Sequence, residues 1–151
     1  MFNRILVAYD QSPEAESAAT TVLALASHLK AKVLLVTVMA PPSGFDTLAN
    51  SIQAGYLEES RKHELEALTQ KHDAIKKKAS EAQVEIESRI LEGPVLENLL
   101  SAAESFHPDL VVLGLHHHGH GLDLIGTLHR VARDIRCPIM AVPDLKKIKT
   151  T

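Results

Sequence analysis

The chain has 151 residues, of which 45% are hydrophobic and 23% charged, and its formal net charge is −3. This length and composition predict one globular domain with a real core and exclude a disordered chain. The negative charge and the scarcity of aromatic residues argue against nucleic-acid binding, which needs basic patches or aromatic stacking platforms.

The sequence favours a reducing compartment and no membrane association. A single cysteine, Cys137, excludes an intramolecular disulfide framework. No apolar run approaches the length of a membrane span. The run from Ile5 to Ala8 is too short for a secretory signal, and Asp10 follows it closely. We therefore expect a cytoplasmic protein.

Strand-like apolar runs alternate with helical patterns along the chain. The runs predicted as strands are residues 2–9, 32–38, 84–90, 110–113 and 138–143, and the predicted helices begin near residues 12, 52, 94 and 124. Ser12 and Pro13 fit the N-cap and first position of the first helix. Five strands separated by four helices imply an α/β fold: an open, twisted parallel sheet with helices on both faces. Rossmann-like and flavodoxin-like strand orders both satisfy this pattern.

The segment from Ile52 to Ala82 is predicted as one long, charged, amphipathic helix. The loop before it, within residues 41–55, is left open as a lid or contact surface. Four histidines on helical patterns are expected at the surface or at an interface: His28, His63, His72 and His129. The buried stripe of the long helix is expected to include Leu57, Leu65, Leu68 and Ile75.

The junction between residues 109 and 127 is the most informative part of the chain. An apolar run ending at Gly114 meets a glycine- and histidine-rich stretch, and a helical pattern follows. Such a junction lies at the carboxyl end of a parallel strand, where backbone N–H groups and a helix N-terminus face an incoming anion. Thr127 adds a hydroxyl donor. The sequence therefore predicts a phosphate site here.

The histidines of this junction allow three interpretations: His116, His117, His118 and His120. They could bind Zn²⁺ or Ni²⁺, but no cysteine or carboxylate is spaced to complete a structural zinc site. They could form a solvated loop. They could also gain protons as a phosphate binds, so that affinity rises below about pH 6.5. We predict no metal site.

Two further residues have both a functional and a structural interpretation. Asp10, after the first strand, could accept a ribose hydroxyl or hold Mg²⁺, or it could be an Asx-turn residue that starts the helix. Cys137 could be a redox sensor, but reactivity needs a lowered pKa and exposure, and buried packing is the favoured interpretation.

Four segments of the chain, taken in order, resemble motifs of the universal stress protein A family. Residues 5–12 resemble its opening strand and acidic turn, residues 91–94 the turn into its third helix, residues 108–114 its fourth strand and residues 137–143 its last strand. Each motif is weak alone, but together they are fairly specific. The resemblance implies a Rossmann-like fold of the adenine nucleotide alpha hydrolase type, with strand order 3-2-1-4-5, a homodimer and a role in stress survival. It covers residues 1–145 as one domain and leaves 146–151 as a basic tail.

One branch of that family binds ATP through a Gly-x2-Gly-x9-Gly-Ser/Thr loop, and another lacks it. Here Gly114 matches the first glycine and Gly126-Thr127 the closing pair. His117 stands at the second glycine, with eight residues between it and Gly126. Matching Gly119 instead breaks both intervals. The chain thus departs from the nucleotide-binding pattern at this position.

The resemblance implies a set of site residues for ATP or AMP. Ala8, Tyr9 and Asp10 would border the nucleoside, Val38 would face the adenine, and the phosphates would meet the loop, with the candidate residues Gly114, His116, His117, Gly119, Gly126, Thr127 and Leu128. The resemblance also implies that two copies pair through the last strand, at Ile139, Met140, Ala141 and Val142.

The sequence as a whole predicts a regulatory module that binds an adenine nucleotide, with Mg²⁺ as an accompanying ion. No nucleophile–base pair or paired carboxylates stand out, so no catalytic residue is assigned and any ATP hydrolysis would be slow. The alternatives are a nucleotide-independent dimeric interaction protein, with a protein partner that the sequence does not name, and a metal-binding histidine loop.

Overall fold

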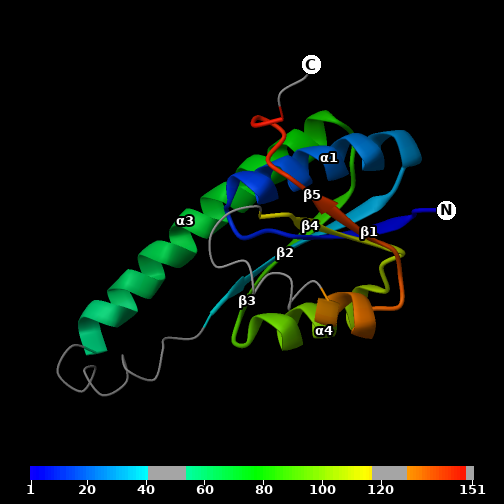
Figure 1. Cartoon of the computed structure of the whole chain (residues 1–151). Coiled ribbons are helices and arrows are strands. Elements are labelled where there is room, and N and C mark those ends of the chain that lie inside the picture. The colour runs from blue at the N-terminus through cyan, green and yellow to red at the C-terminus, as the bar shows by residue number, and fades with distance from the viewer. Residues whose placement is uncertain (41–53, 117–128, 149–151) are drawn as a thin grey trace.

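The computed structural model describes residues 1–40, 54–116 and 129–148 (Figure 1). The elements are β1 (Arg4–Ala8), α1 (Pro13–Leu29), β2 (Lys32–Met39), α3 (Ala54–Glu81), β3 (Ile86–Glu92), α4 (Val95–Phe106), β4 (Leu110–Gly114) and β5 (Ile139–Val142). Residues 129–134 form a further helical stretch. The predicted alternation is confirmed, with shifted boundaries: β3 begins two residues later than the sequence pattern indicates.

The five strands form one parallel sheet in the order β3-β2-β1-β4-β5. This is the order implied by the family resemblance. Figure 1 shows α1 and α3 on one face of the sheet, and α4 with helical residues 129–134 on the other. The chain runs from β1 to β2 and β3 on one side, and then returns to β4 and β5 on the other. The strand order therefore reverses between β1 and β4.

Each face of the sheet has its own apolar core. The core beneath α1 and α3 includes Ile5 and Val7 of β1, whereas the core beneath α4 includes Leu6 of the same strand. Alternate residues of a strand point to opposite faces, so a central strand covered on both sides is apolar throughout. This explains why β1 and β2 read as continuous apolar runs.

Residues at the two ends of α1 explain where the helix begins and ends. Ser12 is the N-cap, and its hydroxyl accepts a hydrogen bond from the Ala15 backbone N–H, at 3.0 Å. Pro13 occupies the first helical position, where the missing N–H costs nothing. The helix ends at Lys30, which has a left-handed backbone. The start of α1 just beyond β1 brings its first turn to the carboxyl edge of the sheet.

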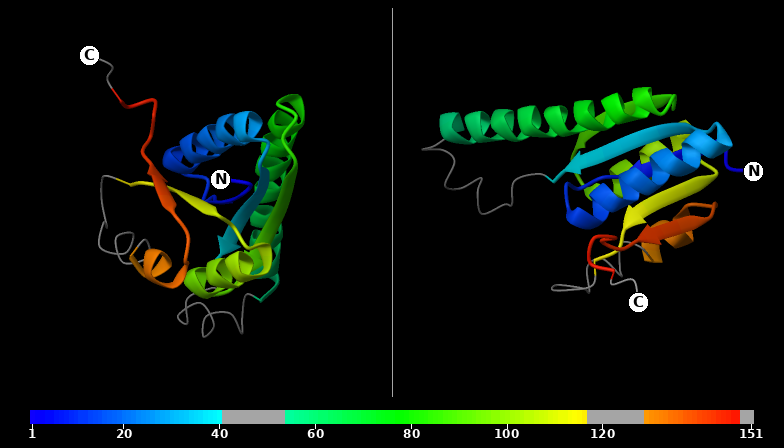
Figure 2. Two further views of the ribbon diagram at one scale, coloured as in Figure 1. Left: turned by 90° about the vertical axis from the view of Figure 1, so that its right-hand side faces the viewer. Right: turned by 90° about the horizontal axis from the view of Figure 1, so that it is seen from above.

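Helix α3 lies on the sheet only with its second half, and its first half extends past the sheet edge (Figure 2). The expected burial of Leu68 and Ile75 is confirmed, but that of Leu65 is wrong: its side chain is 43% exposed. Leu65 lies where the helix has already left the sheet, so amphipathic spacing alone did not locate the contact. The side chain of Leu57 is outside the described residues.

Candidate functional site

The strand reversal creates a candidate site at the carboxyl edge of the sheet. β1 and β4 are neighbours, with Val7 opposite Val112. The segments that follow them therefore emerge side by side, one leading to α1 on the first face and the other toward the opposite face. In open α/β sheets, ligands bind in the crevice that such divergent connections leave.

Asp10 lies at this edge with an exposed carboxylate. Its Oδ1 accepts hydrogen bonds from the Ser12 backbone N–H at 3.0 Å and from the Ser12 hydroxyl at 2.5 Å. This is an Asx turn, so the structural interpretation of Asp10 is confirmed. Its Oδ2 faces the segment after β4, so the Asx turn leaves the second oxygen turned toward the candidate site.

His116, the second residue after β4, lies between two carboxylates. Its Nε2 is 3.2 Å from Oδ2 of Asp10, and its Nδ1 is 3.2 Å from Oε2 of Glu14. An ionised carboxylate only accepts hydrogen bonds, so both contacts are hydrogen bonds when the ring carries a proton on each nitrogen. The structure thus brings His116 and Asp10 together. Glu14 was not predicted as a site residue, because its contact depends on how closely the first turn of α1 approaches the end of β4, and no sequence pattern indicates that distance.

Gly114 is required by packing at the end of β4. A Cβ at this position would lie 2.8 Å from the backbone nitrogen of Ala15 and 2.9 Å from the carbonyl carbon of Glu14. No side chain fits there unless α1 moves. The glycine that the sequence assigned to a phosphate loop therefore already has a structural role, which is to let the first turn of α1 approach β4.

The residues expected around the nucleoside divide between the two faces of the sheet. Ala8 and Val38 are half-buried and pack on the α4 side. Tyr9 is buried on the α1 side, and its hydroxyl donates to the Glu16 carboxylate. Burial, and then the bond to Glu16, raise the pKa of Tyr9 above its ordinary value. Only the backbone of Tyr9 is therefore available at the site.

The remaining candidate residues of the loop lie outside the described residues: His117, Gly119, Gly126, Thr127 and Leu128, together with His118 and His120. In the described ranges, no group of three or more His, Cys, Asp or Glu side chains is arranged to hold a metal ion. Nor does any helix in those ranges combine the length and apolar character needed to cross a bilayer.

The surface position predicted for His72 is wrong. The residue was expected at the surface or an interface, but its side chain is only 2% exposed. It lies on α3 four residues after Leu68 and three before Ile75, both buried. That i, i+4, i+7 spacing is the signal that could have found it.

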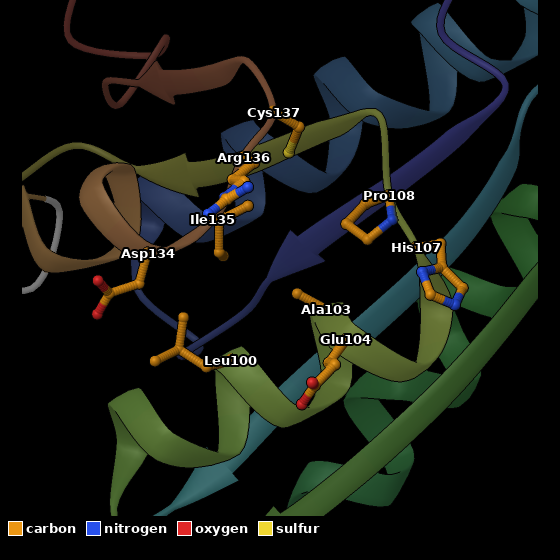
Figure 3. Close-up of a pocket in the computed structure, with 9 residues that line it drawn as sticks. All are labelled: Leu100, Ala103, Glu104, His107, Pro108, Asp134, Ile135, Arg136 and Cys137. Carbon is orange, nitrogen blue, oxygen red and sulfur yellow. The ribbon is translucent and has the colours of Figure 1, made fainter.

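Cys137 lines a separate cleft of about 460 Å³ at the opposite end of β4 and β5, between α4 and the helical stretch 129–134 (Figure 3). Burial, and then the nearby Asp109 carboxylate, raise the pKa of this thiol. This favours packing over redox sensing. At the rim, Asp134 already accepts a hydrogen bond from Arg133, at 3.0 Å, so its charge is compensated within the chain.

The last strand, β5, is an edge of the sheet. Ala141 is exposed, and Ile139 and Met140 are half-buried. Val142 is only 4% exposed and belongs to the core beneath α1. Among the four residues expected at a dimer interface, Val142 thus has its side chain turned inward.

The sequence matches the model of the universal stress protein family over residues 1–143. The chain belongs to the universal stress protein family. Its sheet, with order 3-2-1-4-5 and helices on both faces, has the adenine nucleotide alpha hydrolase-like fold of that family. No curated protein matches the sequence.

Solved structures of universal stress proteins share this fold. UspA from Lactobacillus plantarum is 19% identical, with a TM-score of 0.71, and the match covers 93% of this chain and 97% of that one. A universal stress protein in complex with cAMP is 19% identical, with a TM-score of 0.67 and coverage of 95% and 98%. A family protein from Arabidopsis thaliana with AMP bound is 18% identical, with a TM-score of 0.63 and coverage of 98% and 97%.

Proposed function

We propose that this universal stress protein is a regulatory module that binds an adenine nucleotide, ATP or AMP, at the carboxyl ends of β1 and β4. The observation that carries the proposal is the meeting of Asp10 and His116 where the strand order reverses. A carboxylate that accepts ribose hydroxyls and a loop that offers phosphate donors are both needed at such a crevice. Asp10 comes from the segment after β1, which would supply the carboxylate, and His116 comes from the segment after β4, which would supply the phosphate loop.

The surroundings of Asp10 fit a nucleoside better than a bare anion. Ala8 and Val38 present half-buried apolar side chains on the α4 face, close to the ends of β1 and β2. An adenine ring needs such an apolar surface together with backbone donors and acceptors. The universal stress proteins of the same fold with cAMP and AMP bound support the choice of an adenine nucleotide.

The first turn of α1 is not the place we assign to the phosphates. The Ala15 N–H donates to the Ser12 hydroxyl and the Glu16 N–H donates to the Ser12 carbonyl, so these donors are already used. Asp10 and Glu14 also add negative charge there. We therefore assign the phosphates to the loop after β4, with Gly126, Thr127 and Leu128 as the candidate donors. Mg²⁺ would arrive with the phosphates of ATP, whose oxygens are ligands that this ion prefers.

We also propose a homodimer that pairs through β5, acting in the cytoplasm in stress survival through a protein partner. Support for the pairing comes from the position of β5 at the sheet edge, where unpaired backbone groups invite a second strand. The exposed Ala141 leaves room for a partner to approach. A twofold axis would then place the same strand of both copies together.

Titration calorimetry with AMP and with Mg-ATP tests the nucleotide proposal. We expect binding by the unmodified protein and about tenfold weaker binding by Asp10→Asn, because the charged acceptor of a ribose hydroxyl becomes a neutral amide. Asp134→Asn is the matched control: it removes a carboxylate at the opposite end of the sheet and should bind normally. No heat with either nucleotide at millimolar concentration would reject the proposal and favour a nucleotide-independent interaction protein.

A further inference from the structure

A buried polar chain of contacts lies directly under the candidate site and is not explained by nucleotide contacts. It begins at His72 of α3, continues to Thr37 of β2 and ends at Tyr9, just beyond β1. All three side chains are at least 95% buried. Buried polar groups need hydrogen-bond partners, so each bond in this chain constrains the others.

The hydrogen-bond geometry fixes the protonation of His72. The Thr37 hydroxyl donates to the Tyr9 carbonyl oxygen at 2.6 Å, and Nε2 of His72 lies 2.7 Å from the same hydroxyl oxygen. A hydroxyl has one proton, and the carbonyl can only accept it. Nε2 must therefore carry the imidazole proton and donate to Thr37. A neutral His72 ring is therefore the Nε2–H tautomer, with Nδ1 unprotonated.

The other ring nitrogen, Nδ1, has no acceptor in the described part of the chain to which a proton could be donated. Nδ1 of His72 is buried and has no hydrogen-bond partner among the described residues. A second proton there would create a buried charge with an unsatisfied N–H. Burial accordingly lowers the pKa of His72; Asp73 acts to raise it and Lys76 to lower it.

The groups packed around the ring belong to three other elements. The His72 and Tyr9 rings meet edge to face, with centroids 5.8 Å apart. The Tyr9 hydroxyl donates to Glu16 of α1. Thr37 supplies the contact from β2. Within the part of the chain that the structure describes, the charged groups that bear on the imidazole are Asp73 and Lys76 of its own helix and, beyond the Tyr9 ring, Glu16.

The end of this chain of bonds is the peptide that leads into the candidate site. The Tyr9 carbonyl is part of the peptide bond between Tyr9 and Asp10. The next residue, Gln11, has a left-handed backbone, with φ 67°. Thr37, which is bonded to His72, thus fixes the peptide bond before Asp10 through the Tyr9 carbonyl. Ser12 and His116 fix the Asp10 carboxylate through their own contacts.

We propose that His72 is a positioning residue for Asp10: its neutral imidazole, through Thr37, holds the Tyr9–Asp10 peptide, and a second proton, on the buried and unpartnered Nδ1, weakens the packing of α3 against the site. The effect on nucleotide affinity rests on the proposed function above, whereas the effect on the peptide does not. Because burial lowers the pKa of His72 in the fold, the stabilisation from the neutral ring is complete above about pH 6.5, the ordinary value, and declines as the pH falls toward the lowered pKa.

The tautomer is tested on the unmodified, isotope-labelled protein by long-range ¹H–¹⁵N NMR spectra of the imidazoles. At pH 7.5, we expect the His72 ring to be neutral and protonated on Nε2. A ring protonated on Nδ1, or charged at this pH, overturns the proposal. This measurement needs neither a variant nor a ligand.

Positioning is tested by amide hydrogen exchange in the pair Thr37→Val and Thr37→Ser. Valine keeps the shape and removes the hydroxyl, whereas serine keeps the hydroxyl. We expect exchange of the Ser12 amide, which is bonded to Asp10, to be about tenfold faster in Thr37→Val than in Thr37→Ser. Equal rates overturn the proposal even if the protein binds no nucleotide.

The pH effect is tested by comparing the AMP affinity of the unmodified protein with that of His72→Gln. The glutamine amide can donate to Thr37 but does not titrate. We expect the ratio of the affinity of the unmodified protein to that of the variant to be about one at pH 7.5 and to fall several-fold toward pH 5.5, because only the unmodified protein acquires a buried charge at this position. His63→Gln, on the exposed face of the same helix, is the matched control and should show a constant ratio.

The outcomes separate the two proposals. If AMP binds and the His72→Gln ratio stays constant with pH, the weakening on protonation is wrong. If AMP does not bind at any pH, the proposed function is wrong, and the exchange rates and the tautomer still decide whether His72 positions the Tyr9–Asp10 peptide.

Discussion

The α-carbon of Gly114 faces the backbone nitrogen of Ala15 so closely that a Cβ would lie 2.8 Å from it. The end of β4 therefore rests against the first turn of α1 with no space for a side chain. This contact brings His116, two residues further on, within reach of Glu14 and Asp10. Gly114 thus helps to shape the candidate site through packing alone.

Gly114→Ala should destabilise the protein by about 1–3 kcal/mol, because the added methyl group forces the backbone of α1 away from β4. Urea unfolding measured by circular dichroism checks this. Ala132→Ser, a substitution at an exposed helical position, is the control and should change the free energy of unfolding by less than about 0.5 kcal/mol. An unchanged midpoint in Gly114→Ala would show that α1 shifts without cost.

The sequence predicted the architecture well for identifiable reasons. β1 and β2 are buried on both faces, so their apolar runs are continuous. Ser12 and Pro13 marked the start of α1 by local chemistry alone. The strand order could not be derived in this way, because Rossmann-like and flavodoxin-like orders need the same succession of elements. It came from the family resemblance.

The candidate site was predictable only in part. Asp10 and Gly114 could be placed because Asp10 closely follows β1 and Gly114 ends β4, and parallel strands end at the same edge of the sheet. The contact of His116 with Glu14 depends on how closely α1 packs against β4, which no sequence period encodes. For His72, by contrast, the sequence did carry the information. Its spacing places it on the buried stripe with Leu68 and Ile75, but its polarity was given more weight than that position.

The thiol of Cys137 should be alkylated by iodoacetamide at pH 8 more slowly than the thiol of glutathione. Burial and the Asp109 carboxylate raise its pKa, so a smaller fraction is thiolate, and only the thiolate reacts. Mass spectrometry over time gives the rate. The urea-unfolded protein is the internal control and should react at the ordinary rate. Labelling of the folded protein as fast as that of glutathione would support a redox-sensing role instead.

The proposed homodimer predicts a particular substitution on β5. Met140 packs partly against the core beneath α1, so a charge there would disturb both the fold and an interface. Ala141 is exposed, and a long cation at this position should leave the fold intact while blocking a partner strand. Ala141→Arg should therefore shift the mass in sedimentation from about twice 16.5 kDa to 16.5 kDa at micromolar concentration. Ala67→Arg, on the exposed surface of α3, is the control and should remain dimeric. A single-chain mass for the unmodified protein would refute the dimer, and a dimer that survives Ala141→Arg would place the interface elsewhere.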